Sequence, residues 1–224
     1  MLFLLILTTA LAQNPSAPQW PNVYALSFLE DTFSVYGVNQ VSGTVFYNYS
    51  LGTTRVDRSN GRYDRFCSLN EWFLFFDTPC TQLVNNGIRY LIYPELQVCC
   101  NCCSASDGCG VVKPTWLQNA TYTGTHMYNG TIPSYSWLTM SFEPVFYQET
   151  QDPAPLNRFP LEIDIGPSDK FMFASSNSWN TSFSSNVFNV PTYCQSQYMC
   201  DSSSLCGQVR GSGGKSELLK YLVG

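Results

Sequence analysis

Cysteines crowd one short stretch of this chain. Five of the ten lie within eleven residues: Cys99, Cys100, Cys102, Cys103 and Cys109. In a cytosolic protein such a cluster would indicate a metal site. In an exported protein an even cysteine count indicates a disulfide framework instead. The compartment therefore decides how the cluster constrains the fold.

The first residues favour export. Met1 to Ala12 is almost wholly apolar and ends in Ala10-Leu11-Ala12, a small-x-small pattern typical of a signal-peptide cleavage site. The segment is shorter than the roughly 20 apolar residues that span a membrane. No later stretch is long and apolar enough to do so. We therefore expect a secreted, soluble protein with no transmembrane anchor.

Export predicts that all ten cysteines are oxidised, with no metal and no cofactor. Neighbours such as Cys99 and Cys100 rarely pair with each other because their Cβ vectors diverge. The cluster is therefore expected to reach the five distant cysteines, in pairings that the sequence leaves open. The alternative is a zinc or iron–sulfur site, but the single histidine, His126, is far from the cluster. The distant cysteines are Cys67, Cys80, Cys194, Cys200 and Cys206.

Four Asn-x-Ser/Thr sequons agree with export, and they predict a glycoprotein. Their asparagines are Asn48, Asn119, Asn129 and Asn180. Charged residues make up only 12% of the chain, against about 25% in an average domain. The net charge is −5 and there is no basic run, so we do not expect nucleic acid as a partner.

Alternating polar and apolar residues predict an all-β fold. Gly43, Val45 and Tyr47 fall on one face of a strand, with Thr44 and Phe46 on the other. Further strands are expected at 24–35, 72–76, 88–93, 120–126, 134–142, 145–149, 161–165 and 171–174. The predicted organisation is a signal peptide (1–12), a proline-rich lead-in (13–22), a disulfide-rich β-domain (23–206) and a glycine-rich tail (207–224) with room for a short helix at 216–223.

A charged hairpin is expected between the first strands and the cysteine cluster. Ser59-Asn60-Gly61 lies between 55–58 and 62–66, and Asn-Gly between strands is a strong hairpin signal. Five of its six charged residues alternate in sign, which favours cross-strand ion pairs on a solvated face. The alternative is an anionic head-group site beside an apolar groove. These five are Arg55, Asp57, Arg58, Asp64 and Arg65.

One run of motifs resembles a known family. The order is Gly43-Thr-Val-Phe-Tyr47, Arg55-Val-Asp-Arg58, Thr78-Pro-Cys80, Arg89-Tyr-Leu-Ile-Tyr-Pro94, Cys99-Cys-x-Cys-Cys103, Gly108-Cys-Gly110, Pro114-x-Trp-Leu117, Ala120-x-Tyr-x-Gly124 and Trp137. It resembles secreted LolA-like proteins of single-celled eukaryotes and, more distantly, ependymin-related proteins. The similarity spans roughly residues 24–194, and the chain past Cys194 departs from it.

The resemblance implies a strongly curved antiparallel sheet, a half-barrel, with a hydrophobic groove on its concave side that suits acyl chains. Ependymin-related proteins are also calcium-responsive. Here Glu162, Asp164 and Asp169 offer carboxylates, although a solvated acidic edge is the favoured interpretation and there is no EF-hand loop.

The first functional hypothesis is therefore a carrier that binds an apolar small molecule or lipid. The expected groove residues belong to the more apolar phase of their strands: Tyr47, Tyr49, Tyr90, Ile92, Tyr122 and Trp137. The competing interpretation is that these residues are simply core.

A second hypothesis is a structural glycoprotein of an extracellular coat or filament. It would assemble with copies of itself or with other coat proteins when the lead-in adds as a strand to a neighbour's sheet edge. Catalysis is not expected, because His126 is the only histidine and no nucleophile elbow or phosphate loop is present.

Glycan is predicted on Asn48 and Asn119, since both fall on the polar phase of a predicted strand, where a sugar meets water. Peptide mapping of native protein before and after deglycosylation would check this. Two unmodified asparagines would mean that the inward and outward phases are assigned the wrong way round.

Overall fold

The computed structural model describes residues 14–34, 37–68, 77–140, 143–167, 169–173, 179–194 and 198–211. These residues form one antiparallel sheet of eleven strands that does not close into a barrel, which confirms the predicted all-β, disulfide-stapled class. The strands are β1 (Val23–Ser34), β2 (Gly37–Asn48), β3 (Thr53–Arg58), β4 (Cys80–Asn85), β5 (Ile88–Tyr93), β6 (Val98–Ser104), β7 (Thr121–Tyr128), β8 (Ile132–Met140), β9 (Pro144–Thr150), β10 (Pro160–Ile165) and β11 (Asp169–Phe173). One α-helix, α1 (Leu205–Gly211), and three 3₁₀ turns, η1 (Ala105–Asp107), η2 (Pro155–Asn157) and η3 (Ser185–Phe188), complete it.

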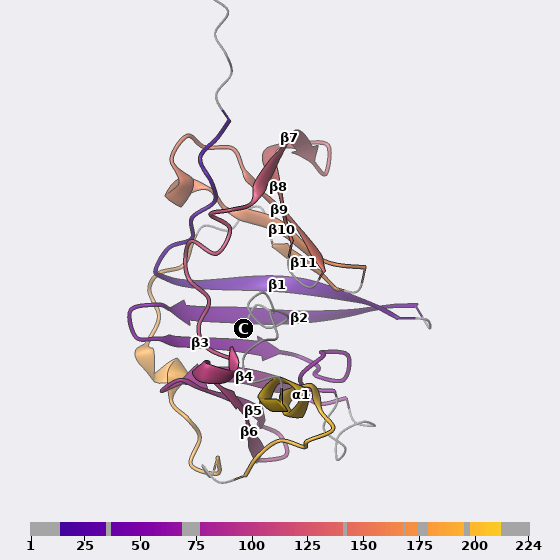
Figure 1. Cartoon of the computed structure of the whole chain (residues 1–224), viewed down its shortest axis with the longest axis vertical. Coiled ribbons are helices and arrows are strands. Elements are labelled where there is room, and N and C mark those ends of the chain that lie inside the picture. The colour runs from indigo at the N-terminus through magenta and orange to yellow at the C-terminus, as the bar shows by residue number, and fades with distance from the viewer. Residues whose placement is uncertain are drawn as a thin grey trace, which may run out of the picture.

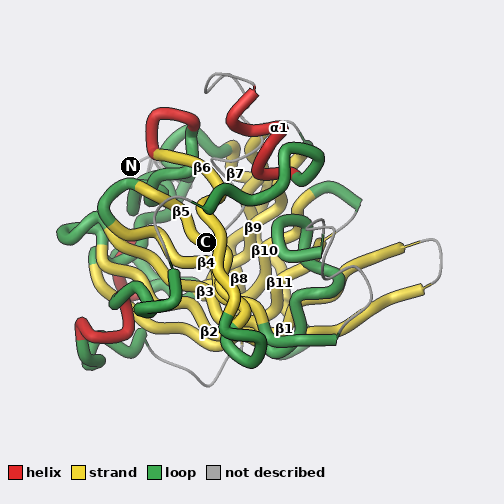
Figure 2. The backbone as a smooth tube through the Cα atoms, turned by 90° about the horizontal axis from the view of Figure 1, so that it is seen from below, coloured by secondary structure: helices red, strands yellow, loops and turns green. Residues whose placement is uncertain are grey.

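The sheet consists of two meanders that meet in its middle. The strand order is β6-β5-β4-β3-β2-β1-β11-β10-β9-β8-β7. The chain therefore runs outward from β1 to β6, crosses to the far edge at β7, and returns strand by strand to β11 beside β1 (Figure 1). β1 and β2 pair with each other along their whole length, whereas β3 pairs with β2 only from Gly43 onward. Their ribbon consequently projects beyond the rest of the sheet (Figure 2).

The two faces of the sheet are covered differently. We call the face that carries Tyr24, Leu26 and Phe28 the core face, and the face that carries Ser27 and Leu29 the opposite face. The core face holds the largest apolar cluster, which extends across the sheet from Val56 in β3 to Trp137 in β8. On the opposite face the segment 183–194 covers β4 to β6, whereas Leu29 of β1 is 43% exposed.

The lead-in and the crossing segment fill the core face. Figure 1 shows the chain between β6 and β7 passing over β3, β2 and β1. Trp20 of the lead-in donates its backbone N–H to the Pro114 carbonyl oxygen (3.0 Å) and its indole N–H to the Tyr147 hydroxyl (3.0 Å). Leu117 of the crossing segment is buried in the same cluster. These contacts place two irregular segments where a packed helix would otherwise be required.

Five disulfides staple the chain. Cys99, Cys100 and Cys102 of β6 bond to Cys194, Cys200 and Cys206, across 95 to 104 residues. This confirms the outward reach predicted for those three. The expectation was wrong for the others, because Cys103 pairs with Cys109 inside the cluster and Cys67 pairs with Cys80. No cysteine among the described residues is free.

The charged hairpin predicted around Ser59-Asn60-Gly61 is wrong. β3 pairs with β4, and residues 59–68 form turns instead of a second strand. The physical reason is the buried Asp64, whose Oδ1 accepts hydrogen bonds from the backbone N–H groups of Phe66 (3.0 Å) and Cys67 (2.8 Å). These bonds satisfy the backbone locally and compete with a strand ladder.

Other expectations have mixed outcomes. The turn at Asn86-Gly87, with φ of 50° and 73°, joins β4 to β5, and an Asn-Gly pair favours such a turn. Helix α1 was not predicted: it occupies the start of the expected tail, where Arg210 donates to the Cys200 carbonyl oxygen (2.7 Å). The signal peptide, the strand at 72–76 and the helix at 216–223 lie outside the described residues.

Gly43 tests how β1 packs on β2. A Cβ at this position would lie 2.2 Å from Phe28 Cζ and 2.5 Å from the Asp57 carbonyl oxygen. Gly43→Ala should therefore lower the free energy of unfolding by about 1–3 kcal/mol through overpacking, measured by urea denaturation. Gly211→Ala, whose Cβ would meet nothing within 4 Å, is the control and should not destabilise. Equal stabilities of the two variants would contradict the packing of Phe28 over Gly43.

Candidate functional site

Three of the six residues expected to line a groove lie together in the core. Tyr47 and Trp137 are buried, and Tyr122 packs partly buried against the same cluster. The Tyr47 hydroxyl donates to the Val112 carbonyl oxygen (2.6 Å), and the Trp137 indole N–H donates to Glu149 Oε1 (3.0 Å). Their surroundings are occupied by the lead-in and the crossing segment, as the core interpretation expects.

The other three residues lie elsewhere. Tyr90 and Ile92 are buried on the opposite face, in a cluster covered by residues 183–194. Tyr49 follows β2 in an exposed turn, where its ring stacks on that of Tyr47 with centroids 6.4 Å apart. The structure therefore brings Tyr47, Tyr122 and Trp137 together but does not unite all six around one cavity.

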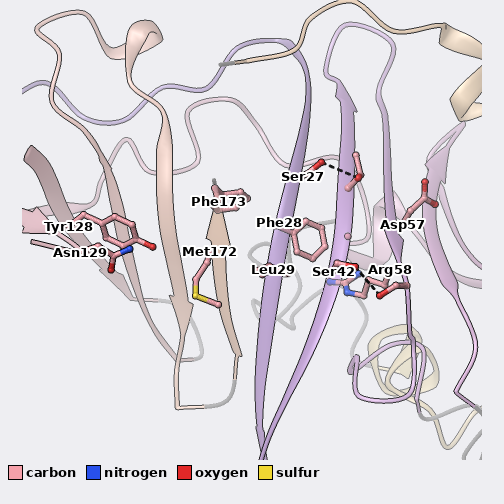
Figure 3. Close-up of a pocket in the computed structure, with 13 residues that line it drawn as sticks. Ser27, Phe28, Leu29, Ser42, Asp57, Arg58, Tyr128, Asn129, Met172 and Phe173 are labelled. Atoms are coloured by element: carbon pink, nitrogen blue, oxygen red, sulfur yellow. Dashed lines mark hydrogen bonds between the residues drawn. The ribbon is translucent and has the colours of Figure 1, made fainter. Parts of the chain in front are cut away.

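A groove of about 790 Å³ lies on the opposite face, over β1, β2, β3 and β11 (Figure 3). Such a volume is within the range of about 300–1,000 Å³ typical of small-molecule sites. Its floor carries Leu29 of β1 and Met172 of β11, which are cross-strand partners. The tip of the β7–β8 hairpin, with Tyr128 and Asn129, forms one side.

The floor combines an apolar strip with a polar one. Leu29 and Met172 present apolar side chains, and next to them the hydroxyls of β1 to β3 form two contacts. Ser27 Oγ lies 3.4 Å from Thr44 Oγ1, and Ser42 Oγ donates to Ser59 Oγ (3.2 Å). The groove therefore offers apolar surface beside hydroxyls that can donate to or accept from a ligand.

Ionisable side chains of β10 and β11 lie near the hairpin tip. Burial and the Glu162 charge raise the pKa of Tyr128. Glu162 forms an ion pair with Lys170 Nζ (2.8 Å). Burial and the neighbouring Glu162 raise the pKa of Asp164 to about 6. This side of the groove therefore carries a small cluster of ionisable side chains.

The charges of the expected hairpin are mostly neutralised inside the protein. Arg58 Nε lies 2.6 Å from Glu30 Oε2 and 3.3 Å from Asp64 Oδ2, with all three side chains buried. Arg65 contacts Asp169 (2.8 Å). The Arg55–Asp57 pair (2.9 Å) and Arg65 are partly exposed, so the expectation of a solvated charged face was wrong for Arg58 and Asp64. The arginines that an anionic head group would need already contact the chain's own carboxylates.

Two arrangements bear on metal binding. The sulfur atoms of Cys102, Cys103 and Cys109 lie within 4.8 Å of one another, but each belongs to a disulfide. Of the three carboxylates considered for calcium, Glu162 and Asp164 lie on the opposite face, whereas Asp169 is buried beside Arg65. These three carboxylates therefore do not meet at one point in the structure.

The sequon asparagines are all accessible to some degree. Asn119, Asn129 and Asn180 are exposed, and Asn48 at the end of β2 is half-buried, with Oδ1 accepting from the Leu51 N–H (3.1 Å). Asn119 precedes β7 instead of lying within a strand. Among the described residues there is no helix long and apolar enough to cross a membrane.

Sequence reasoning missed the groove. Its floor lies on the more polar phase of β1 and β2, a pattern that predicts a solvated surface. The available signal was an apolar residue, Leu29, within that polar phase. Met172 and the hairpin tip join Leu29 only through strand order, because β11 returns to pair with β1. No local pattern in the sequence specifies that return.

The raised pKa of Asp164 predicts a pH dependence. Because the folded protein retains a proton that the unfolded chain releases, this side chain favours folding at pH below about 3.8, and that contribution is lost as pH rises to about 6. Asp164→Asn should match the wild type at low pH and have the higher melting temperature above pH 6. Parallel curves of melting temperature against pH for the two proteins would contradict the assignment.

Comparisons with known proteins identify no family for this chain. No protein-family model and no curated protein matches it. A solved structure described as an uncharacterized conserved protein from Thermus thermophilus matches with 7% sequence identity and a TM-score of 0.47. The match covers 78% of this chain and 89% of that one. This likeness is too low to support an argument about function, so the site must be interpreted from its own residues.

Proposed function

We propose that this protein is a secreted glycoprotein that binds a small amphipathic, lipid-like molecule in the groove over β1, β2, β3 and β11. The observation that carries the proposal is the exposed Leu29, 43% accessible on the floor of a space of about 790 Å³. An exposed leucine alone is common on protein surfaces, but a concave site with apolar surface and a few polar groups is the usual form of a ligand pocket.

The chemistry of the floor favours an amphipathic ligand. Leu29 and Met172 would contact an acyl chain or a similar apolar body, while Ser27, Ser42 and Thr44 would hydrogen-bond a neutral polar end. A strongly anionic end is disfavoured, since Asp57 lines the same groove and Arg58 is already paired with Glu30. The resemblance to LolA-like and ependymin-related proteins is consistent with such a ligand, although none of the six expected residues lines this groove.

Secretion and glycosylation rest on the sequons, the apolar N-terminal segment and the five disulfides, since disulfides persist in oxidising compartments. We propose no catalysis, because the residues that line the groove include neither histidine nor cysteine.

The coat or filament alternative depends on a free lead-in strand. Here the lead-in binds its own sheet: the buried Arg158 donates to the Ser16 carbonyl oxygen (2.7 Å), and Trp20 is in the core. Strand donation to a neighbour would require these contacts to break. We therefore favour the carrier.

Leu29→Ser tests the proposal with Leu51→Ser as its matched control. Leu51 is 59% exposed in the turn after β2, away from the groove. Leu29→Ser should weaken binding of a fluorescent fatty alcohol by roughly tenfold, about 1.4 kcal/mol, and Leu51→Ser should leave it unchanged. Melting temperatures of both variants should stay near that of the wild type, because neither leucine is buried.

Native mass spectrometry of the wild type from its own source provides an independent measurement. A retained lipid-sized mass would support the carrier. If the wild type binds no apolar probe and carries no such mass, the proposed function is wrong.

A further inference from the structure

We propose that the N-linked glycan of Asn129 lies over the mouth of this groove and restricts entry to it. Asn129 is the one sequon asparagine among the residues that line the groove. It is exposed at the β7–β8 turn, and an accessible turn is a favourable acceptor for glycosylation.

The local structure directs this asparagine toward the groove. Asn129 has a φ of 48°, in the left-handed region that asparagine tolerates better than most residues. Figure 3 shows Tyr128 and Asn129 at the side of the groove that faces Met172. The asparagine that would carry the first sugar thus belongs to the rim of the groove.

The floor suits the inner sugars of such a glycan. A sugar ring has hydroxyls at its edge and an apolar C–H face. The hydroxyls of Ser27 and Thr44, beside Leu29 and Met172, offer a complement to both. Asn180 pairs with Ala25 of β1 but is not among the residues that line the groove.

Two variants of Thr131 separate the glycan from the asparagine. Thr131→Ala destroys the sequon, whereas Thr131→Ser keeps it, and both leave Asn129 and the exposed turn intact. The proteins are made in a glycosylating eukaryotic host, and site occupancy is confirmed by peptide mapping.

The first readout needs no ligand. Met172 lies on the groove floor, and Met140, 66% exposed at the end of β8, is an internal reference. We expect hydrogen peroxide to convert Met172 to its sulfoxide about threefold faster or more in Thr131→Ala than in the wild type or Thr131→Ser, with Met140 unchanged, since oxidation follows exposure. Equal rates at Met172, or an unoccupied Asn129 in the wild type, would overturn the proposal.

The second readout rests on the proposed function. A fluorescent fatty alcohol should associate several-fold faster with Thr131→Ala than with Thr131→Ser. If no variant binds the probe but Met172 is protected in the glycosylated proteins, the carrier function fails while the placement of the glycan stands. If the probe binds equally fast to both variants and Met172 is equally reactive, the glycan does not cover the groove.

Discussion

The pairing of β1 with β11 holds this structure together. The register from Phe28↔Phe173 to Thr32↔Asp169 joins a meander that runs outward to β6 with one that returns from β7. Between the meanders there is no other direct strand pairing in the described sheet. Because the chain must cross the core face to begin the second meander, this one junction also determines what covers the core. The groove follows from it too, since Met172 comes beside Leu29 only when β11 docks on β1.

Several charged side chains are buried near the junction of β1 and β11. Glu30 of β1, Arg58 of β3 and Asp169 of β11 are all buried at the same end of the sheet. The nearby Asp64 and Glu30 charges raise the pKa of Arg58 despite its burial, which keeps the guanidinium charged. Removing one partner would leave an uncompensated buried charge, which is strongly destabilising. The network therefore stabilises the fold and occupies arginines that could otherwise bind a ligand.

The sequence predicted what is local and missed what is not. Alternation located β2, which has one face in the core, and an apolar run located β5, which is buried on both faces. Asn86 and Gly87 form the β4–β5 hairpin turn through positive φ. The hairpin predicted at Asn60-Gly61 is absent because Asp64, three residues later, accepts backbone hydrogen bonds that stabilise turns instead of a strand. Tyr47 and Trp137 share one face of the sheet, and Tyr90 lies on the other. Strand order and the crossing segment determine this arrangement. Of the six residues expected to face a groove, Tyr49 is 38% exposed in the turn after β2, and the other five pack into filled clusters on the two sides of the sheet.

The sequence separation between disulfide partners determines when each bond can form during synthesis. Cys99, Cys100 and Cys102 are synthesised about a hundred residues before their partners, whereas Cys103 and Cys109 follow each other within six. On the secretory route proposed above, at synthesis rates of about 5–20 residues per second, Cys99, Cys100 and Cys102 carry reactive thiols for several seconds before their partners are made. Any bond formed among them in that interval must be exchanged before the segment from Cys194 to Cys206 can dock. Maturation of this protein is therefore a problem of thiol–disulfide exchange as much as of strand pairing, and its yield should depend on disulfide isomerase activity.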